Sequence, residues 1–164
     1  MKKLKETLIY SSIILMVILV RTFIITPVIV NGSSMEPTLL NKEILLLSKN
    51  NQNIERFDVV VLEINGERLV KRVVGLPGEH LKYVNNHLYI NHNMLEEQYL
   101  EKQTNNFNID ELGFSTIPYN AYFVLGDNRT SSKDSRFFGM ININQIIGKV
   151  KYRIFPINRL GKIK

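Results

Sequence analysis

The chain begins with a short basic segment followed by a long apolar one. Three lysines lie within residues 1–7, residues 8–20 are almost wholly apolar, and apolar character resumes after Arg21. The unbroken run is shorter than the ~20 residues that a membrane crossing needs. However, Arg21 can extend its charged end to the lipid–water boundary. We therefore predict one transmembrane helix over residues 8–25.

The placement of charge predicts the orientation of that helix. Lysines ahead of an apolar helix favour the cytoplasmic side. We predict that residues 1–7 are a cytoplasmic tail and that residues 26–164 form an extracytoplasmic domain at the cell membrane. A cleaved signal peptide would share the basic start and the apolar run, but no small-x-small cleavage site follows Val20.

From residue 28 onward, short runs rich in β-branched residues replace the helical pattern, and each is too short for an ordinary helix. The runs lie at residues 28–30, 43–47, 58–62, 121–125 and 146–154. Asn65-Gly66 follows the third run and predicts a tight hairpin, because both turn positions need φ > 0. The returning strand covers residues 68–74, and residues 81–90 predict a second hairpin with a looser turn.

The remaining long stretch, residues 93–117, is polar, rich in Asn and Gln, and weakly patterned. We predict that it is a variable surface excursion, either a loop or a small β-ribbon. Outside residues 8–25 no long stretch has a helical period, so we predict a mainly β domain. The 164 residues allow one modest domain plus an anchor.

Composition excludes several kinds of chemistry. There is no cysteine, which excludes disulfides, thiolate metal sites and a cysteine nucleophile. Three histidines lie close together without an HExxH pattern, so we expect no metal and no other cofactor. The net charge of +6 fits a basic tail and attraction to anionic lipid. Nucleic acid is not an expected partner, because the sequence has no ladder of basic and aromatic residues.

Residues 32–39, Gly-Ser-Ser-Met-Glu-Pro-Thr-Leu, are the first candidate for chemistry. Such residues form turns, and a serine in a turn becomes a nucleophile only with a base. A histidine base is disfavoured because the histidines flank or lie in a predicted hairpin, and no Gly-x-Ser-x-Gly elbow exists. A lysine can serve if burial lowers its pKa. Lys71, among valines, is the best candidate, although the pattern alone favours a charged residue on the outer face of a strand.

Four segments together resemble bacterial type I signal peptidases, in particular the Gram-positive branch. They are residues 34–38 (SMEPT), 56–61 (RFDVVV), 71–78 (KRVVGLPG) and 126–136 (GDNRTSSKDSR). Each motif alone is weak, but four in this order at this spacing are specific. The resemblance implies a mainly β fold of the LexA and signal peptidase type, preceded by one transmembrane helix.

The resemblance also implies a mechanism. Ser34 would be the nucleophile and Lys71 its general base, acting through an acyl-enzyme. Ser132 would donate or accept a hydrogen bond with Lys71 and hold it in position. Asp134 and Arg136 would pair and stiffen the loop that carries Ser132.

A further expectation concerns the oxyanion formed during attack on the carbonyl. The Ser34 N–H would be one donor. Some family members add a hydroxyl two residues before the nucleophile, where this chain has Gly32. The second donor is therefore unassigned. Asp127 is expected to turn the loop.

The implied substrates are secreted preproteins cut after a small-x-small motif, by an enzyme at the lipid bilayer that is expected to be a monomer. Shallow apolar pockets would select the small residues. Their walls would come from Val28, Val30, Met35, Leu39, Leu69 and Val70. For Met35 the alternative is ordinary core packing, because methionine fills irregular gaps well.

Three other functions are considered. A self-cleaving repressor of related fold would need a pair of DNA-binding helices, where this chain has an apolar helix. A membrane-anchored nucleic-acid-binding module would need a basic stripe with stacking aromatics. A catalytically silent family member, acting as a binding or assembly factor, would usually lack the serine or the lysine, and both are present.

Overall fold

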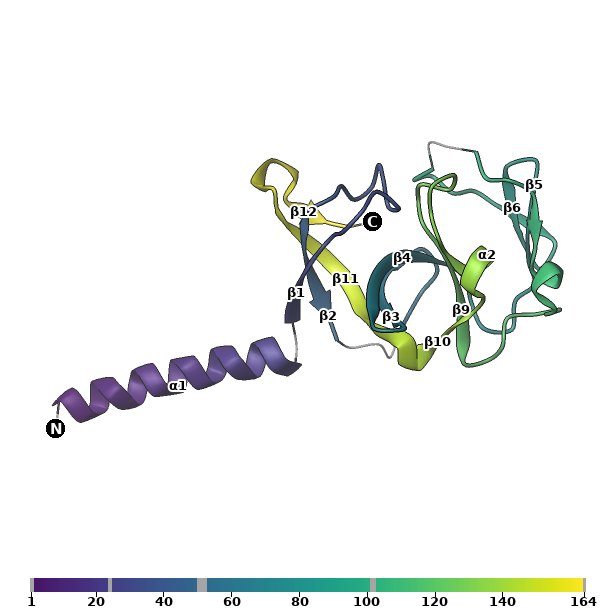
Figure 1. The fold of residues 1–164 in the computed structure, drawn as a ribbon. Helices are drawn as coiled ribbons and strands as arrows, with labels where there is room; N and C mark the ends of the chain where they lie inside the picture. The colour runs from purple at the N-terminus through teal and green to yellow at the C-terminus, as the bar shows by residue number, and fades with distance from the viewer. Residues whose placement is uncertain (1, 24, 50–52, 101–102, 164) are drawn as a thin grey trace.

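One long helix leads into a β-rich domain (Figure 1). The structure, a computed structural model, describes residues 2–23, 25–49, 53–100 and 103–163. The helix α1 spans Lys2–Phe23. The main sheet contains β1 (Ile25–Ile29), β2 (Ile44–Ser48), β3 (Val59–Ile64), β4 (Glu67–Gly75), β9 (Ala121–Leu125), β10 (Ile141–Asn142), β11 (Ile146–Phe155) and β12 (Gly161–Lys162). The prediction of a mainly β domain is confirmed.

A second, smaller sheet lies on the far side of the domain from α1 (Figure 1). It contains β5 (Leu81–Val84), β6 (His87–Ile90), β7 (Asn93–Leu95) and β8 (Phe107–Asn108). Short helical turns connect the strands: η1 (Ile109–Leu112), α2 (Ser135–Phe138), η2 (Ile143–Gln145) and η3 (Ile157–Arg159).

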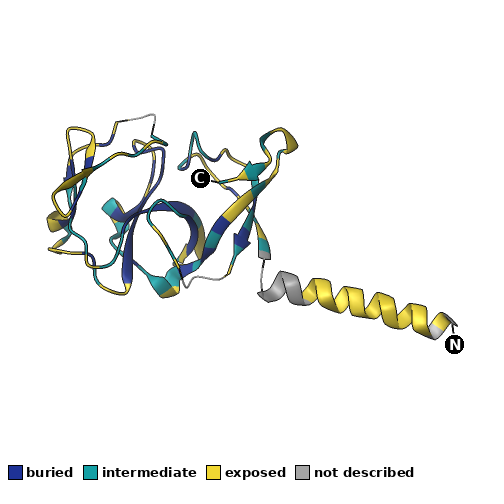
Figure 2. Ribbon diagram, turned by 180° about the vertical axis from the view of Figure 1, so that it is seen from behind, coloured by how far each residue is buried: buried dark blue, intermediate teal, exposed yellow. Residues whose placement is uncertain are grey.

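The helix α1 extends away from the domain, and its described side chains are exposed (Figure 2). Its apolar side chains are more than half exposed from Leu8 to Ile18. The predicted helix over 8–25 therefore exists with other bounds, because β1 already begins at Ile25; residue 24 and the side chain of Arg21 lie outside the described residues. Within the described part of the chain, no helix combines the length and the apolar character needed to cross a membrane.

Both predicted hairpins are present. In the first, Ile64 pairs with Glu67, and the turn residues Asn65 and Gly66 have φ of 52° and 82°. These values lie in the left-handed region that Asn and Gly tolerate best. The second hairpin joins β5 to β6 through Asn85-Asn86, with φ of 50° and 70°.

The strand register brings the distant motifs together. β4 lies between β3 and β9, so Lys71 occupies a central strand. Arg72 pairs with Leu125 at the end of β9. The chain passes from Leu125 directly into the loop that begins at Gly126. Pairing in the sheet therefore delivers residues 126–136 beside Lys71, although more than fifty residues separate them in sequence.

The described residues form three buried clusters in the domain, and one of these clusters corrects a prediction. The stretch 93–117 is not only a surface excursion, because Phe107, Ile109 and Ile117 are buried in the cluster beneath the second sheet. Phe107 stacks on Phe123 of β9 with ring centroids 5.4 Å apart. These apolar residues stand singly among polar ones, so no strand or helix period marked them.

Candidate active site

Ser34 and Lys71 meet in the structure as predicted. Lys71 Nζ lies 2.7 Å from Ser34 Oγ, within hydrogen-bond distance. Ser34 belongs to a tight turn after β1, in which Glu36 N–H donates to the Ser33 carbonyl and Leu39 N–H donates to the Met35 carbonyl. The turn buries Met35, the residue after Ser34, and this restricts the direction of the Ser34 side chain.

Lys71 is buried, which is the environment that a lysine needs if it is to act as a base. Only 2% of the residue is exposed, and no ion pair to another described residue is present. Burial lowers the pKa of Lys71 from about 10.5 to about 8, while the charges of Asp134 and Asp127 limit the fall. The neutral amine, which can accept the Ser34 proton, is therefore far more populated near physiological pH than in an ordinary lysine.

The loop of residues 126–136 packs directly against the serine turn. Asn128 N–H donates to the Ser34 carbonyl at 3.0 Å, and its side-chain amide donates to the Ser33 carbonyl at 3.2 Å. A side chain on Gly126 would overlap both Ser132 Oγ and the Ser34 carbonyl oxygen. Glycine at this position therefore permits the close approach of the two loops.

The predicted pair of Asp134 and Arg136 is present and stiffens this loop. The guanidinium binds the carboxylate with two hydrogen bonds, each 2.8 Å long. Asp134 also accepts from the N–H of Gly126 at 3.2 Å, and Arg136 donates to the Arg129 carbonyl at 2.8 Å. Both ends of the loop are thus tied to one fully buried carboxylate.

The predicted hydrogen bond between Ser132 and Lys71 is not formed in this structure. Ser132 is buried, and its Oγ has no hydrogen-bond partner among the described residues. It faces the α-carbon of Gly126 instead, close to the Ser34 carbonyl. Lys71 has Ser34 Oγ as its partner here, which leaves the Ser132 hydroxyl at the edge of the site.

The backbone N–H of Ser34 has no hydrogen-bond partner among the described residues, so it is available to donate to a bound group. The N–H of Gly32 is already used, because it donates to Asn41 Oδ1 at 3.1 Å. Gly32 has a φ of 95°, in the left-handed region that suits glycine, so its observed role is to let the chain turn.

Comparison with known proteins identifies the family. Residues 4–155 match the family model described as signal peptidase, peptidase S26. A signal peptidase I from Bacillus caldolyticus is 40% identical, over 86% of this chain and 85% of its own. A signal peptidase IB from Staphylococcus aureus is 37% identical, over 96% and 92% of the two chains. The chain belongs to the signal peptidase family.

A solved structure agrees with this assignment. The crystal structure of a signal peptidase I from Enterococcus faecalis is similar, with 37% sequence identity and a TM-score of 0.56. The match covers 59% of this chain and 96% of the other. The predicted resemblance to the Gram-positive branch of signal peptidases is therefore confirmed.

An ion pair beside Lys71 was missed by sequence reasoning. Arg72 binds Asp127 with two hydrogen bonds of 2.9 and 2.7 Å, and both side chains are completely buried. Arg72 also donates to the Phe57 carbonyl at 2.8 Å, and its guanidinium lies 3.9 Å from the centre of the Tyr99 ring. Asp127 therefore fastens the loop to β4, besides turning it. Both residues lie inside motifs of the family resemblance, at residues 71–78 and 126–136, and this was the sequence signal that could have indicated the pair.

A second buried arginine in this signal peptidase fold connects the loop to the small sheet. Arg129 binds Glu97 at 2.6 Å and donates to Tyr83 and Thr104 at 2.9 and 2.8 Å. Glu97 and Thr104 belong to the stretch that was predicted to be a surface excursion. That stretch therefore supports the loop that carries Ser132.

The six predicted pocket residues do not form one pocket. Val28 and Val70 line an open groove of about 300 Å³, here named the Val28 groove, together with Pro27 and Asn31. Three others, Val30, Met35 and Leu39, are buried in the core beside Val28, where the tight serine turn packs them. Leu69 packs against a different cluster, so its predicted place beside Val70 in one pocket is not found.

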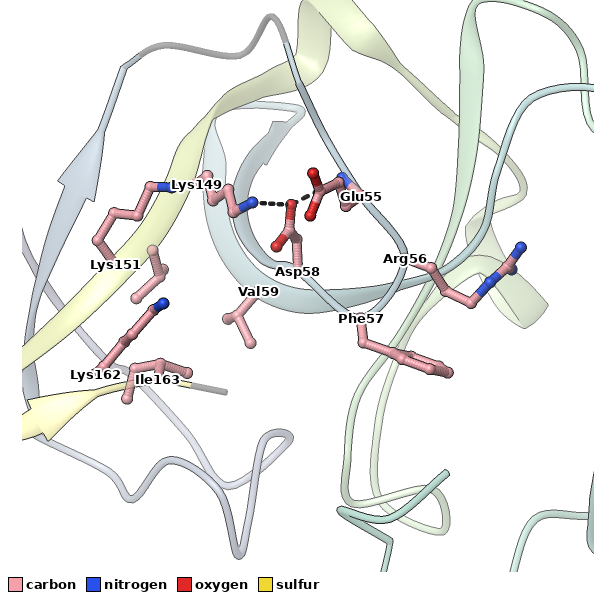
Figure 3. A pocket seen from close by; sticks show the side chains of 10 residues that line it. Glu55, Arg56, Phe57, Asp58, Val59, Lys149, Lys151, Lys162 and Ile163 are labelled. Carbon is pink, nitrogen blue, oxygen red and sulfur yellow. Dashed lines mark hydrogen bonds and ion pairs between the residues drawn. The ribbon is translucent and has the colours of Figure 1, made fainter. Parts of the chain in front are cut away.

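A further hollow lies away from the dyad (Figure 3). Its volume is about 270 Å³, and neither Ser34 nor Lys71 lines it. Figure 3 shows Lys149 pointing to Asp58, with which it forms an ion pair, while Lys162 enters from β12. The Asp58 carboxylate also accepts from the N–H of Glu55 at 2.8 Å. These contacts close the bend before β3.

The buried pair of Arg72 and Asp127 yields a stability prediction. Replacing Asp127→Ala leaves a buried guanidinium without its carboxylate, so we expect a loss of about 3–5 kcal/mol in the free energy of unfolding. Glu63→Ala is the matched control, because Glu63 pairs with Arg68 at 3.4 Å on the surface, and we expect a change below about 1 kcal/mol. Unfolding by guanidinium chloride in detergent measures the free energy of unfolding of both variants. Equal losses in the two variants would contradict a stabilising role for the buried pair of Arg72 and Asp127.

Proposed function

We propose that this signal peptidase family member is a serine endopeptidase that removes signal peptides from secreted preproteins, with Ser34 as nucleophile and Lys71 as general base. The observation that carries the proposal is the 2.7 Å contact of Ser34 Oγ with a buried lysine whose pKa is lowered. The relatives described above are named signal peptidase I or IB. Both dyad residues are present, and nothing favours a catalytically silent role.

The reaction begins with proton transfer. Neutral Lys71 takes the proton of the Ser34 hydroxyl as Oγ attacks the carbonyl carbon of the scissile bond. The resulting oxyanion is met by the Ser34 N–H, which is free to donate. The intermediate collapses when the C–N bond breaks, and Lys71 gives its proton to the leaving amine. Ser34 is then an ester, and water attacks it while Lys71 accepts a proton again.

Ser132 and the paired residues position the base. Once Ser34 carries the acyl group, its Oγ is an ester oxygen and no longer shares a proton with Lys71. We assign to the Ser132 hydroxyl, buried and without a partner at the edge of the site, the task of orienting Lys71 at that stage. Asp134 and Arg136 hold the loop that carries it.

An extended substrate fits between β1 and β4. β1 is an edge strand, and β4 pairs with β9 only from Arg72 onward, which leaves the earlier part of β4 free on that side. Free strand edges bind an extended peptide by main-chain hydrogen bonds. The Val28 groove between them is small and partly apolar, which favours small side chains before the cut.

We propose α1 as the membrane-anchoring segment, with its basic end in the cytoplasm and the β domain outside. Its support is the run of exposed apolar side chains from Leu8 to Ile18, which water solvates poorly, and the exposed lysines Lys3 and Lys5 before it. Anchoring raises the concentration of the site near a preprotein held in the same membrane. We propose that the enzyme acts as a monomer.

The dyad is tested by cleavage of a preprotein with an Ala-x-Ala site by the full-length protein in lipid vesicles. We expect wild type to cut after the second alanine, and both Ser34→Ala and Lys71→Ala to lower the rate by about 10³-fold or more. Lys162→Ala, at an exposed lysine away from the dyad, serves as the control and should keep wild-type activity. Activity that survives in Lys71→Ala would place the base elsewhere.

The pH dependence follows from the pKa of Lys71. Only the neutral amine accepts the serine proton, and its fraction grows as the pH rises through about 8. We expect kcat/KM to rise roughly tenfold per pH unit below this value and to level off above it. Lys71→Arg should be inactive throughout, because a guanidinium stays protonated. A midpoint near 6.5 would instead indicate a histidine.

Membrane attachment is tested by flotation with anionic lipid vesicles. We expect the full-length chain to float with the vesicles, and Ile14→Lys combined with Val17→Lys to weaken flotation severalfold, because charged side chains enter the bilayer at a cost. The control is the double variant Lys151→Gln and Lys162→Gln, which changes exposed residues of the β domain. Equal flotation of the α1 variant and wild type would refute the role of α1.

A further inference from the structure

A second hollow is lined by Ser132, whose side chain lies close to the Ser34 carbonyl, and the mechanism described above gives this hollow no role. It lies between β8 and α2, on the loop that carries Ser132, and its volume is about 570 Å³. Six of the residues that line it matter here: Phe107, Arg129, Ser132, Lys133, Arg136 and Phe137. We name it the Ser132 hollow. Its volume is within the range of pockets that bind ligands.

The position of the Ser132 hollow relative to Ser34 indicates which part of a substrate it receives. The chain runs from the Val28 groove through Asn31 to Ser34. On the other side, the Ser34 carbonyl touches Asn128 and approaches the Ser132 side chain across Gly126. Ser34 is therefore connected to the groove along the chain and to the hollow through the loop that carries Ser132. These two connections make the groove and the hollow candidate sites for the residues before and after the cut.

The charge of the lining is one-sided. Three cations, Arg129, Lys133 and Arg136, line the Ser132 hollow, and no Asp or Glu among the described residues does so. Two of these cations form ion pairs: Arg129 with Glu97 at 2.6 Å and Arg136 with Asp134 at 2.8 Å.

Lys133 is the uncompensated cation of this lining. It is exposed and has no hydrogen-bond or ion-pair partner among the described residues. Beside the charge, Phe107 provides a buried apolar wall, and Phe137 is 71% exposed at the rim. The lining as a whole suits a short peptide with an acidic side chain and disfavours a basic one.

We propose that the Ser132 hollow binds the first residues beyond the cut and favours an acidic side chain there through Lys133. This inference rests on the proposed function and adds a preference on the leaving side of the scissile bond. Lys133 is a specificity residue and takes no part in bond breaking. Because an ion pair at an exposed rim contributes little, the preference is about two- to fivefold in kcat/KM.

The test uses two preproteins that are identical except at the second and third residues beyond the cut, which are Glu-Glu or Lys-Lys. The full-length protein in neutral lipid vesicles cleaves each, and the ratio of kcat/KM for the two is the measurement. We expect wild type to favour the Glu substrate and Lys133→Glu to reverse the order. Lys162→Glu makes the same charge change at an exposed site away from the dyad.

The outcomes separate the inference from the function it rests on. Reversal in Lys133→Glu but not in Lys162→Glu, together with a wild-type ratio that falls in high salt, supports a local ion pair. An unchanged ratio in Lys133→Glu, or an equal change in both variants, overturns the inference while the proposed function stands. Failure of wild type to cleave any of the substrates overturns the proposed function and the inference with it.

Discussion

A lysine held in the core without a carboxylate of its own is the constraint on which the site depends. Lys71 and Arg72 are neighbours on β4, and both are buried, yet only Arg72 has a carboxylate as its ion-pair partner. Arg72 has Asp127 as a partner with two hydrogen bonds, and Asp134 is taken by Arg136 in the same way. The two arginines thus occupy the carboxylates that would otherwise hold Lys71 charged, and desolvation can lower its pKa.

The same contacts join the parts of the domain. The loop of residues 126–136 is tied to β4 through Asp127, to the serine turn through Asn128 and to the small sheet through Arg129. Each of these interactions satisfies a buried polar group, whose burial without a hydrogen-bond partner would destabilise the fold. The site is consequently held by a connected set of interactions, and the second sheet supports the catalytic half from a distance.

Much of the fold and the centre of the site could be predicted from the sequence because local chemistry marked them. Asn65-Gly66 and the β-branched runs indicated the first hairpin, and the motifs indicated Ser34, Lys71 and the Asp134–Arg136 pair. Three features could not be predicted, because they depend on contacts between distant residues. Isolated apolar residues such as Phe107 do not form a periodic pattern. In the sequence, a buried arginine such as Arg72 looks the same as an exposed one. A methionine in the core, such as Met35, likewise looks the same as one that lines a pocket.

The hydrogen bonds from Asn128 to the carbonyls of Ser33 and Ser34 join residues about 95 positions apart. A ribosome adds residues one at a time, so Ser34 emerges long before the loop that supports it. Until residues 126–136 have been added and β9 has paired with β4, Lys71 has no buried environment and remains an ordinary charged lysine. With the proposed dyad of Ser34 and Lys71, the nascent chain is expected to be inert as a protease until the domain is nearly complete.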